Sequence, residues 1–395
     1  NSTTTAVYLH SGADASQVTV NRNNLFSGVA NDGDGQLNAT YNWWGDEDGP
    51  SGAGFGDGST VSEDVDFSPY LDAPIENDPA QTVKILNVDQ NESYTSIQAA
   101  IRAANAGDTI EVADGTYPNV INVTDVQNVT VRATGDATIK PTAMVTWDVG
   151  NSGQQSRETP IRVVDAENLS FEGYTFDFGQ VKDANKQFAG ILYWNSTGSL
   201  RNNHIGNTST SGFYEQTTIF QAEGYTHDDR APVVVANNTY RNTGRQGLVT
   251  HGYVDAHVEN NEFHSADDDA GYAIELGSES TGEIVDNEIH GYADPFNSFS
   301  ESAGVYVENA FTTDVSTPFV KSVRVADNEI YDNQVGIQFG QTWDGYSADV
   351  VIDATFENNH VYDNALAGVH VTDENAPEGS AVHVDASGNI VENNS

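Results

Sequence analysis

A short pattern recurs along the second half of the chain, in which an Asn is followed by a polar and then an apolar residue, as in NNHI, NNEF and DNEI. Successive copies are 35, 23, 26, 41, 31 and 30 residues apart. Repetition at about 20 to 50 residues predicts a solenoid, because each repeat can bury its apolar face only against the next one. The repeated Asn residues are Asn203, Asn238, Asn261, Asn287, Asn328, Asn359 and Asn389.

A second pattern follows each repeated Asn: a small residue, then an apolar, a variable and an apolar one. Alternation with a period of two predicts a strand with one buried face. Each coil therefore holds at least two short strands that pair in parallel with the next coil, and Asn at the turn can form a ladder with its neighbours. The copies begin at Gly212, Gly247, Ala273, Gly304, Gly336 and Gly368.

A short helix is predicted near residues 96–106. Thr95 or Ser96 can cap its first turn, and Gly107 can end it. Its apolar residues fall on one face, so we expect it to cover the open first coil, where a bare sheet edge would otherwise be unpaired. That face consists of Ile97, Ala100, Ile101 and Ala104.

This stretch, together with the NNEF and DNEI coils, resembles the pectate-lyase-like β-helix superfamily, including the NosD-like domains of carbohydrate-binding and sugar-hydrolysing proteins. The resemblance covers most of the chain. It implies an all-β fold, a right-handed parallel β-helix solenoid with a short N-terminal capping α-helix. Because the superfamily contains lyases, hydrolases, epimerases, adhesins and phage fibres, the resemblance specifies a fold and leaves the activity open.

The two ends of the sequence suggest an interrupted solenoid. Residues 1–72 resemble the C-terminal coils and closing segment of a preceding β-helix, residues 73–82 a linker, and residues 83–395 a second β-helix with an open C-terminal end. If a further copy of the N-terminal sequence followed, its Asn24 would lie 30 residues after Asn389, which is one coil length. We therefore expect like β-helix units to join end to end, in a tandem array.

The composition indicates a protein that is exposed to a high-salt environment outside the cell. The chain has 59 acidic and 15 basic residues, a formal net charge of −44, and no cysteine. Molar salt shortens the screening length to about 3 Å, which removes the repulsion between such carboxylates. We expect a halophilic, archaeal surface protein; nucleic acid and anionic membranes are disfavoured partners, and no apolar run of about 20 residues predicts membrane insertion. The density of Asn-x-Ser/Thr glycosylation sequons fits an exported protein. They occur at Asn1, Asn38, Asn91, Asn122, Asn128, Asn168, Asn195, Asn207, Asn237 and Asn393.

One row of residues is the candidate polysaccharide-contacting face. The variable position of the second pattern is expected to point outward, and two residues further on His251 and Glu308 emerge at the edge of the same face. Aromatic rings and polar groups in one row suit a sugar-binding groove, although an ordinary solvated face is the alternative. The row consists of Tyr214, Val249, Glu275, Tyr306, Gln338 and His370.

Catalytic and metal candidates were found near this row. The resemblance implies a basic residue that removes a proton beside a uronate carboxylate, for which Arg245 with His251 is the candidate pair. A hydrolase would need two carboxylates about 5 to 9 Å apart, which Glu275 with Glu308 or Asp267 could supply. No cofactor is required, but the oxygen-rich turns of residues 31–35, with Asn31, Asp32 and Asp34, and of residues 45–49 could bind Ca²⁺. The resemblance to lyases implies a further Ca²⁺ site, for which Asp267, Asp268 and Asp269 are the candidate ligands.

Histidines occur without HExxH or another short metal-binding spacing, so zinc is not expected. Two functions remain open on the sequence. The first is an extracellular structural or adhesive module, such as a repeating filament or stalk unit that contacts a surface polysaccharide. The second is a polysaccharide lyase, epimerase or glycoside hydrolase that acts in the groove over residues 245–308.

Overall fold

The computed structural model divides the chain into one unit of residues 1–113 and another of residues 114–395. The predicted domains 1–72, 73–82 and 83–395 stay a prediction. The described residues are 5–54, 56–68, 70–71, 74–75, 84–147, 157–179, 181, 187–208, 215–265, 271–293, 302–308, 319–340, 350–373 and 379–395.

The unit of residues 114–395 is built from three sheets of short strands. The first sheet has, in spatial order, β10 (Gly115–Tyr117), β13 (Ala137–Ile139), β18 (Thr175–Asp177), β21 (His204–Gly206), β24 (Thr239–Arg241), β27 (Glu262–His264), β30 (Glu288–His290), β33 (Glu329–Tyr331), β36 (His360–Tyr362) and β39 (Ile390–Glu392). The second has β11 (Ile121–Thr124), β16 (Ile161–Val164), β19 (Gln187–Trp194), β22 (Glu215–Ala222), β25 (Gln246–Gly252), β28 (Tyr272–Leu276), β31 (Ala303–Val307), β34 (Val335–Phe339) and β37 (Ala367–Val371). The third has β12 (Gln127–Ala133), β17 (Glu167–Glu172), β20 (Gly198–Arg201), β23 (Ala231–Ala236), β26 (Val254–Glu259), β29 (Thr281–Val285), β32 (Phe319–Ala326), β35 (Val350–Glu357) and β38 (Ala381–Ser387).

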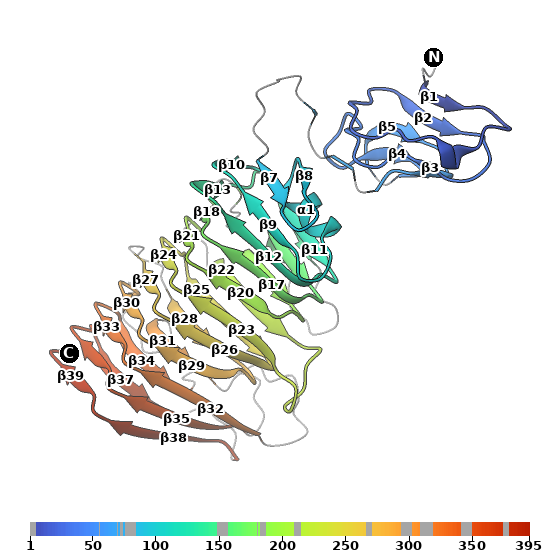
Figure 1. The fold of residues 1–395 in the computed structure, drawn as a ribbon. Coiled ribbons are helices and arrows are strands. Elements are labelled where there is room, and N and C mark those ends of the chain that lie inside the picture. Colours follow the sequence, from blue (N-terminus) through green and yellow to red (C-terminus); the bar gives the residue numbers. More distant parts are fainter. Residues whose placement is uncertain are drawn as a thin grey trace. The chain divides into compact units, whose positions relative to one another are not determined.

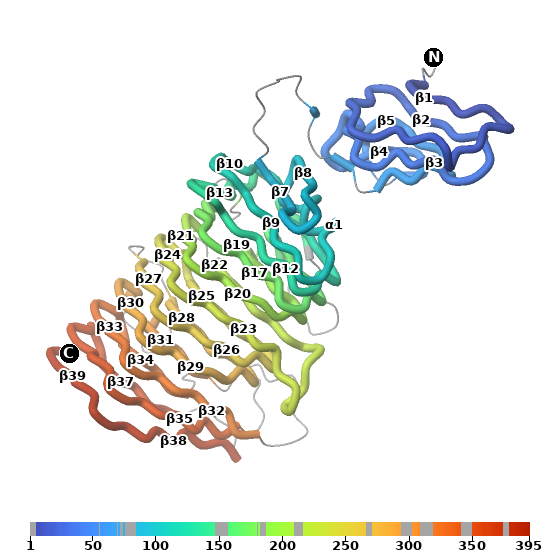
Figure 2. The backbone as a smooth tube through the Cα atoms, viewed as in Figure 1, coloured from blue at the N-terminus to red at the C-terminus, as the bar shows by residue number. Residues whose placement is uncertain are grey.

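Each coil gives one strand to each sheet, as β24, β25 and β26 do. Successive coils stack, so strands of neighbouring coils pair in parallel, and the chain can be followed coil by coil in Figures 1 and 2. One antiparallel pair, β14 (Val145–Trp147) with β15 (Arg157–Thr159), joins the second sheet beside β19. The predicted all-β, parallel β-helix is confirmed, with three strands per coil where the sequence patterns indicated at least two.

The interior of the coils is filled by rows of apolar side chains that lie in register. In the first sheet, Tyr240 stacks on Phe263 with 4.5 Å between ring centroids, and Ile289, Ile330 and Val361 continue the row. All five are fully buried. The period-two alternation of the sequence produces this arrangement, because every second side chain of a strand turns inward.

The repeated Asn residues form the predicted ladder at one turn of the coil. From Asn238 onward, each side-chain oxygen accepts a bond from the backbone N–H of the Asn one coil earlier, for example Asn238 N–H to Asn261 Oδ1 at 2.9 Å, whereas Asn203 Oδ1 accepts from Tyr174 N–H. The residue just before each ladder Asn has a positive φ, between 52° and 70°, which Asn, Asp and Gly tolerate best. These preceding residues are Asn202, Asn237, Asn260, Asp286, Asp327, Asn358 and Gly388.

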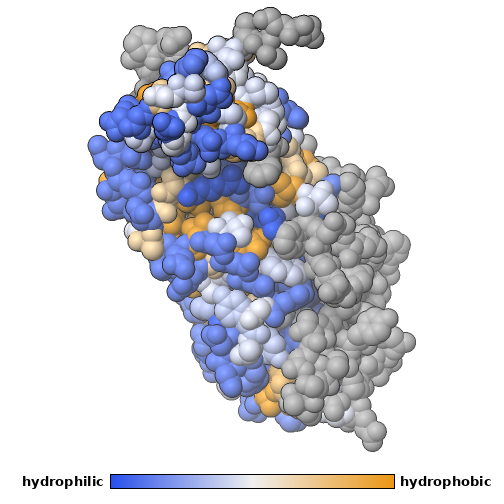
Figure 3. All heavy atoms as spheres, turned by 90° about the vertical axis from the view of Figure 1, so that its right-hand side faces the viewer, coloured by the Kyte–Doolittle hydropathy of each residue, from blue (hydrophilic) through white to orange (hydrophobic). Residues whose placement is uncertain are grey.

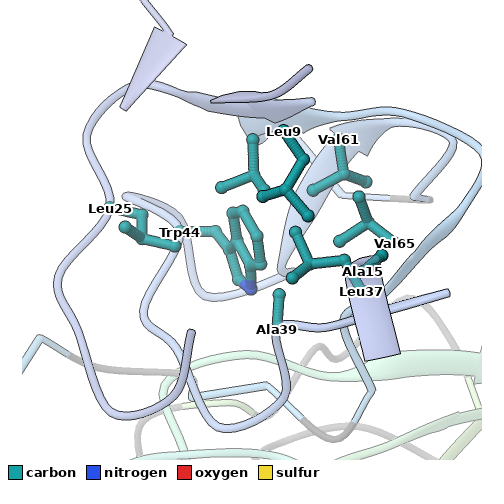
Figure 4. Close-up of a cluster of buried hydrophobic side chains, with 9 residues drawn as sticks. Leu9, Ala15, Leu25, Leu37, Ala39, Trp44, Val61 and Val65 are labelled. Carbon is teal, nitrogen blue, oxygen red and sulfur yellow. The ribbon is translucent and has the colours of Figure 1, made fainter. Parts of the chain in front are cut away.

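The unit of residues 1–113 begins with a small parallel fold around Trp44, whose indole is fully buried. Figure 4 shows the cluster of apolar side chains around it, which includes Leu9, Leu25, Leu37 and Val61. The strands are β1 (Thr5–Leu9), β2 (Gly28–Asn31), β5 (Gly58–Val61) and β4 (Pro50–Gly52) in one sheet and β3 (Leu37–Asn38) with β6 (Val65–Asp66) in another, with the 3₁₀ turn Ala15–Gln17 between β1 and β2.

The same unit ends with the predicted helix. Helix α1 (Ile97–Ala103) packs on an antiparallel set of strands, β7 (Ile85–Asn87), β8 (Glu92–Tyr94) and β9 (Thr109–Val112). Ser96, one of the two predicted caps, accepts a bond from Ala99 N–H at 3.1 Å. The helix ends before the predicted residue 106 because the backbone is already extended at Ala104.

The surface follows the acidic composition. In the face that Figure 3 shows, hydrophilic residues predominate and hydrophobic residues gather in a smaller area among them. In the part of the chain that the structure describes, no helix has both the length and the apolar character needed to cross a membrane.

Candidate functional site

The outer face of the second sheet carries the predicted row of variable residues. Strand register aligns Val249, Glu275, Tyr306, Gln338 and His370, as predicted. Tyr214 lies outside the described residues, and Ile219 is the residue in register with Val249.

The row is not the solvated face that the sequence suggested. Glu275, Tyr306 and Gln338 are at most 4% exposed, and His370 is half-buried. Side chains pack on one another at Tyr306, whose ring stacks on that of Tyr272 with centroids 4.5 Å apart. Leu366 and Ala367 pack against the same cluster.

Two carboxyl groups meet at the centre of this face. One oxygen of Glu275 on β28 and one of Glu308, just after β31, lie within 4.8 Å of each other, and two carboxylates buried this close favour sharing one proton. Burial raises the pKa of Glu275, which Arg245 opposes, and raises that of Glu308 further, because Glu275 adds a like charge. Gln246 donates to Glu275 Oε2, and the Tyr306 hydroxyl interacts with Glu308.

His251 completes the group from β25, one coil earlier. Its Nε2 is 3.8 Å from Glu275 Oε1, and its Nδ1 is 3.2 Å from Ser278 Oγ. Burial, helped by the positive charges of Arg157 and Lys321, lowers the pKa of His251 to about 3. The imidazole is therefore neutral, which makes it a weak base but leaves it able to act as a metal ligand. We call His251, Glu275 and Glu308 the acidic centre.

A glycine leaves space inside the acidic centre. Gly277 continues the strand register between His251 and Glu308. A Cβ at this position would lie 2.7 Å from His251 Nδ1 and 2.8 Å from Glu308 Oε1. Any side chain here would therefore displace the two groups, and only glycine leaves the space between them open.

A buried lysine lies behind the acidic centre. Lys321 on β32 is fully buried, and its ammonium donates to the backbone carbonyls of Leu276, Ser278 and Glu308. Burial lowers the pKa of Lys321 to about 7, which the carboxylates of Glu308, Glu279 and Glu275 oppose. The ammonium joins the two turns that carry Glu275 and Glu308.

Two arginines supply further positive charge. Arg157 on β15 is 5% exposed and donates to the side-chain oxygen of Gln221 at 3.0 Å. Burial lowers the pKa of Arg157 to about 10, against the charges of Glu223 and Glu275. Arg245, the predicted base or clamp, is half-buried, and its charge acts on Glu275.

The predicted metal residues lie elsewhere or outside the described residues. Asn31 is buried, its amide donates to the carbonyls of Gly35 and Asp64 at 2.8 Å, and its oxygen accepts from Gly33 N–H. Asp32 and Asp34 are exposed in the same turn. Asp267, Asp268 and Asp269 lie outside the described residues, so these Ca²⁺ sites stay predictions.

The sequon asparagines are exposed or half-buried, and most occupy turns. Their positive φ gives Asn a backbone reason to be there, because Asn adopts this conformation more readily than most residues. Asn38 and Asn122 lie in strands instead. Glycosylation stays a prediction. Positive φ occurs at Asn91, Asn128, Asn168, Asn195, Asn207, Asn237 and Asn393, of which Asn128 and Asn168 lie near the starts of β12 and β17.

Sequence reasoning found the acidic centre but missed what supports it. Lys321 and Arg157 belong to other strands and carry no local motif. A signal for Gly277 was present, since it lies one coil after His251 and one before Glu308. Reading the register two residues beyond the variable position would have found it.

Comparison with known proteins agrees with the fold. Residues 225–395 match the family described as the right handed beta helix region. No curated protein sequence matches the chain.

Several solved structures are similar at low identity. One is XylC in complex with xylose, which is 10% identical; the match covers 75% of this chain and 65% of that chain, with a TM-score of 0.40. Another is the GH136 lacto-N-biosidase from Eubacterium ramulus, which is 11% identical; the match covers 77% of this chain and 65% of that chain, with a TM-score of 0.42. A third is PfbA, a surface adhesin of Streptococcus pneumoniae, which is 12% identical; the match covers 75% of this chain and 86% of that chain, with a TM-score of 0.34. This chain thus spans about 65% of the length of the first two proteins.

Proposed function

Since residues 225–395 form a right-handed β-helix region, we propose that this chain is an extracellular carbohydrate-acting module whose acidic centre performs acid–base chemistry on a glycan. The observation that carries the proposal is the convergence of His251, Glu275 and Glu308 from three successive coils onto one buried point. In the described part of the chain, no other group of at least three His, Cys, Asp or Glu side chains converges in this way.

Burial of these charges argues for a functional reason. Removing carboxylates from water costs several kcal/mol per ion in general, and apolar residues of the same size would stabilise the fold at least as well. Clusters of buried, coupled ionisable groups on an outer face are typical of sites where protons move. The interior of the neighbouring coils, filled by Ile, Val and Phe, shows that the chain builds apolar rows where only packing is needed.

The chemistry follows from the charge state of the pair. A carboxyl pair that shares one proton offers both an acid and a base at the same point. One oxygen of each carboxyl lies within 4.8 Å of the other, whereas glycosidases place their two carboxyl groups about 5 to 9.5 Å apart around a sugar. A substrate hydroxyl or a water at Gly277 would give its proton to the carboxylate, and the neutral His251 lies beside the same position.

Turnover assays in molar salt test the proposal. Wild type is incubated with uronate-containing and neutral polysaccharides, and reducing ends, unsaturated ends and epimer composition are measured to distinguish hydrolase, lyase and epimerase. Glu308→Gln is expected to lower turnover by at least about 100-fold. Asp353→Asn, which removes an exposed carboxylate on β35, should keep wild-type turnover. No turnover on any glycan, or equal turnover in Glu308→Gln, would overturn the proposal.

A second candidate function is adhesion through the first sheet. Its outer face bears a ladder of adjacent rings: His290–Tyr331 and Tyr331–Tyr362 are stacked with centroids 4.7 and 5.0 Å apart, and His264 is tilted against His290 at 4.4 Å. Such a regular, rigid face favours contact with a repeating polymer. Glycan retention that is lost in Tyr331→Ala but kept in Glu308→Gln would support adhesion through this face.

A further inference from the structure

The acidic centre has the composition and geometry of a metal site. One ligand atom each from His251, Glu275 and Glu308 can be chosen so that all three lie within 4.8 Å of one another. When each ligand atom lies about 2.0 to 2.2 Å from one ion, two ligand atoms are at most about 4.4 Å apart. Small side-chain rotations would therefore bring the three atoms within binding distance of one ion. We infer that these three residues bind one divalent transition-metal ion over Gly277.

An unpartnered oxygen points into the proposed position. Glu308 Oε1 is buried and accepts no hydrogen bond from the described residues, although the side chain is 1% exposed. It faces the space over Gly277, as does the edge of His251. A buried carboxylate oxygen without a donor is costly, and a bound cation would satisfy it.

The surrounding residues orient the ligands. His251 Nδ1, which faces Gly277, lies 3.2 Å from Ser278 Oγ, and Nε2 of the same ring lies 3.8 Å from Glu275 Oε1. Gln246 donates to Glu275 Oε2, which leaves Oε1 on the side of His251. Such second partners hold metal ligands in place. Lys321 does not occupy the position, because its ammonium is held by three backbone carbonyls.

The ligand types select the class of metal. One imidazole and two carboxylates suit Mn²⁺, Co²⁺ or Zn²⁺, whereas Ca²⁺ prefers six to eight oxygen ligands. Three protein ligands leave an open position, as catalytic sites do. The ion would take the place of the proton that the carboxyl pair shares. Its catalytic role rests on the proposed function, since a bound water acidified by the metal would serve as the base for the glycan; metal binding itself does not.

Metal titration of the full chain tests the inference. Protein treated with chelator is dialysed into molar salt and titrated calorimetrically with Mn²⁺, Co²⁺ and Zn²⁺. Wild type is expected to bind one equivalent of at least one of these ions. Glu308→Gln and Gly277→Ala are each expected to weaken binding by at least about 100-fold, the first by removing a ligand and the second by filling the space.

Matched variants control for unrelated effects. Asp353→Asn removes an exposed carboxylate, and Gly179→Ala adds a methyl group whose nearest neighbour, Asp177 Oδ1, would be 3.2 Å away, so both should bind like wild type. Crystals of wild type soaked in Mn²⁺ should show an anomalous peak between His251, Glu275 and Glu308, which makes the test independent of how the variants fold. No saturable binding by wild type, or binding unchanged in Glu308→Gln, would overturn the inference.

Chelation of the active protein separates the two proposals. Saturable metal binding without turnover on any glycan would overturn the proposed function and leave the metal site standing. Turnover that survives chelation, in a protein that binds none of the three ions, would overturn the metal site alone. Turnover that is lost on chelation and restored by the same ion would support both.

Discussion

The Asn ladder and the acidic centre are two stacks of buried polar side chains that the same coils build in different ways. In the ladder, Asn287 Oδ1 accepts two bonds from Asn261, and its amide donates to the carbonyls of Val258 and Val285 and to Asn328, all at 2.9 to 3.0 Å. In the acidic centre, like groups face each other, and Glu308 Oε1 has no donor among the described residues.

The difference separates a structural role from a functional one. A satisfied polar network stabilises and specifies the coil register, because each amide matches the next. The acidic centre instead concentrates carboxylates that folding alone does not require. The ladder is therefore expected to stabilise the fold, and the acidic centre is not. Substitutions in each of the two stacks should show this difference in the free energy of unfolding.

The largest effect is expected in the ladder. Asn287→Leu removes five hydrogen bonds and leaves the N–H of Asn261 and the carbonyls of Val258 and Val285 without this side-chain partner. We expect a loss of about 5 kcal/mol in the free energy of unfolding, measured by urea denaturation in molar salt. A second ladder runs through Asn333, Asn364 and Asn394. Asn394→Leu, at its half-buried last residue, is the control and should cost about 1 kcal/mol, because water replaces its bonds. Equal losses would contradict the comparison.

A smaller loss is expected behind the acidic centre. Lys321→Met removes the ammonium from three backbone carbonyls and leaves the carboxylates without this counter-charge. We expect a loss of about 3 kcal/mol in the free energy of unfolding. The double variant Lys321→Met with Glu308→Gln should recover part of it, because fewer charges are then unbalanced. A double variant whose loss is the sum of the two single losses would show that Lys321 and Glu308 are not coupled.

The smallest effect is expected on the outer face of the first sheet. The Tyr331 hydroxyl donates to Glu288 at 2.6 Å, in a pair that solvent reaches. Tyr331→Phe should change the free energy of unfolding by no more than about 0.5 kcal/mol, since water satisfies the carboxylate. A loss of several kcal/mol would show that this exposed ladder stabilises the coil as the Asn ladder does.

The repeats allowed the fold to be predicted, because one coil needs its Asn and its alternating strand at fixed places. Register then followed, so Glu275, Tyr306 and Gln338 were correctly aligned. Their burial was not predictable, because it results from contacts between coils, such as Tyr272 on Tyr306, that alternation within one strand does not encode.

The composition of the acidic centre was predictable only in part. His251, Glu275 and Glu308 are 24 and 33 residues apart, so no short motif unites them, and a search for HExxH-type spacing could not find a metal site. Stacking of coils supplies the proximity that a helix supplies in such motifs. Lys321 and Arg157 come from strands whose sequence gives no reason to place a charge there.

The most direct test of the central claim is the unfolding free energy of chelator-treated Glu308→Gln, measured beside wild type and Asn287→Leu under the same conditions. Gln has the shape of a protonated Glu and carries no charge, so the variant should be at least as stable as wild type while its turnover is lost. A loss of stability as large as that of Asn287→Leu would show that Glu308 is needed for folding, and would contradict the account.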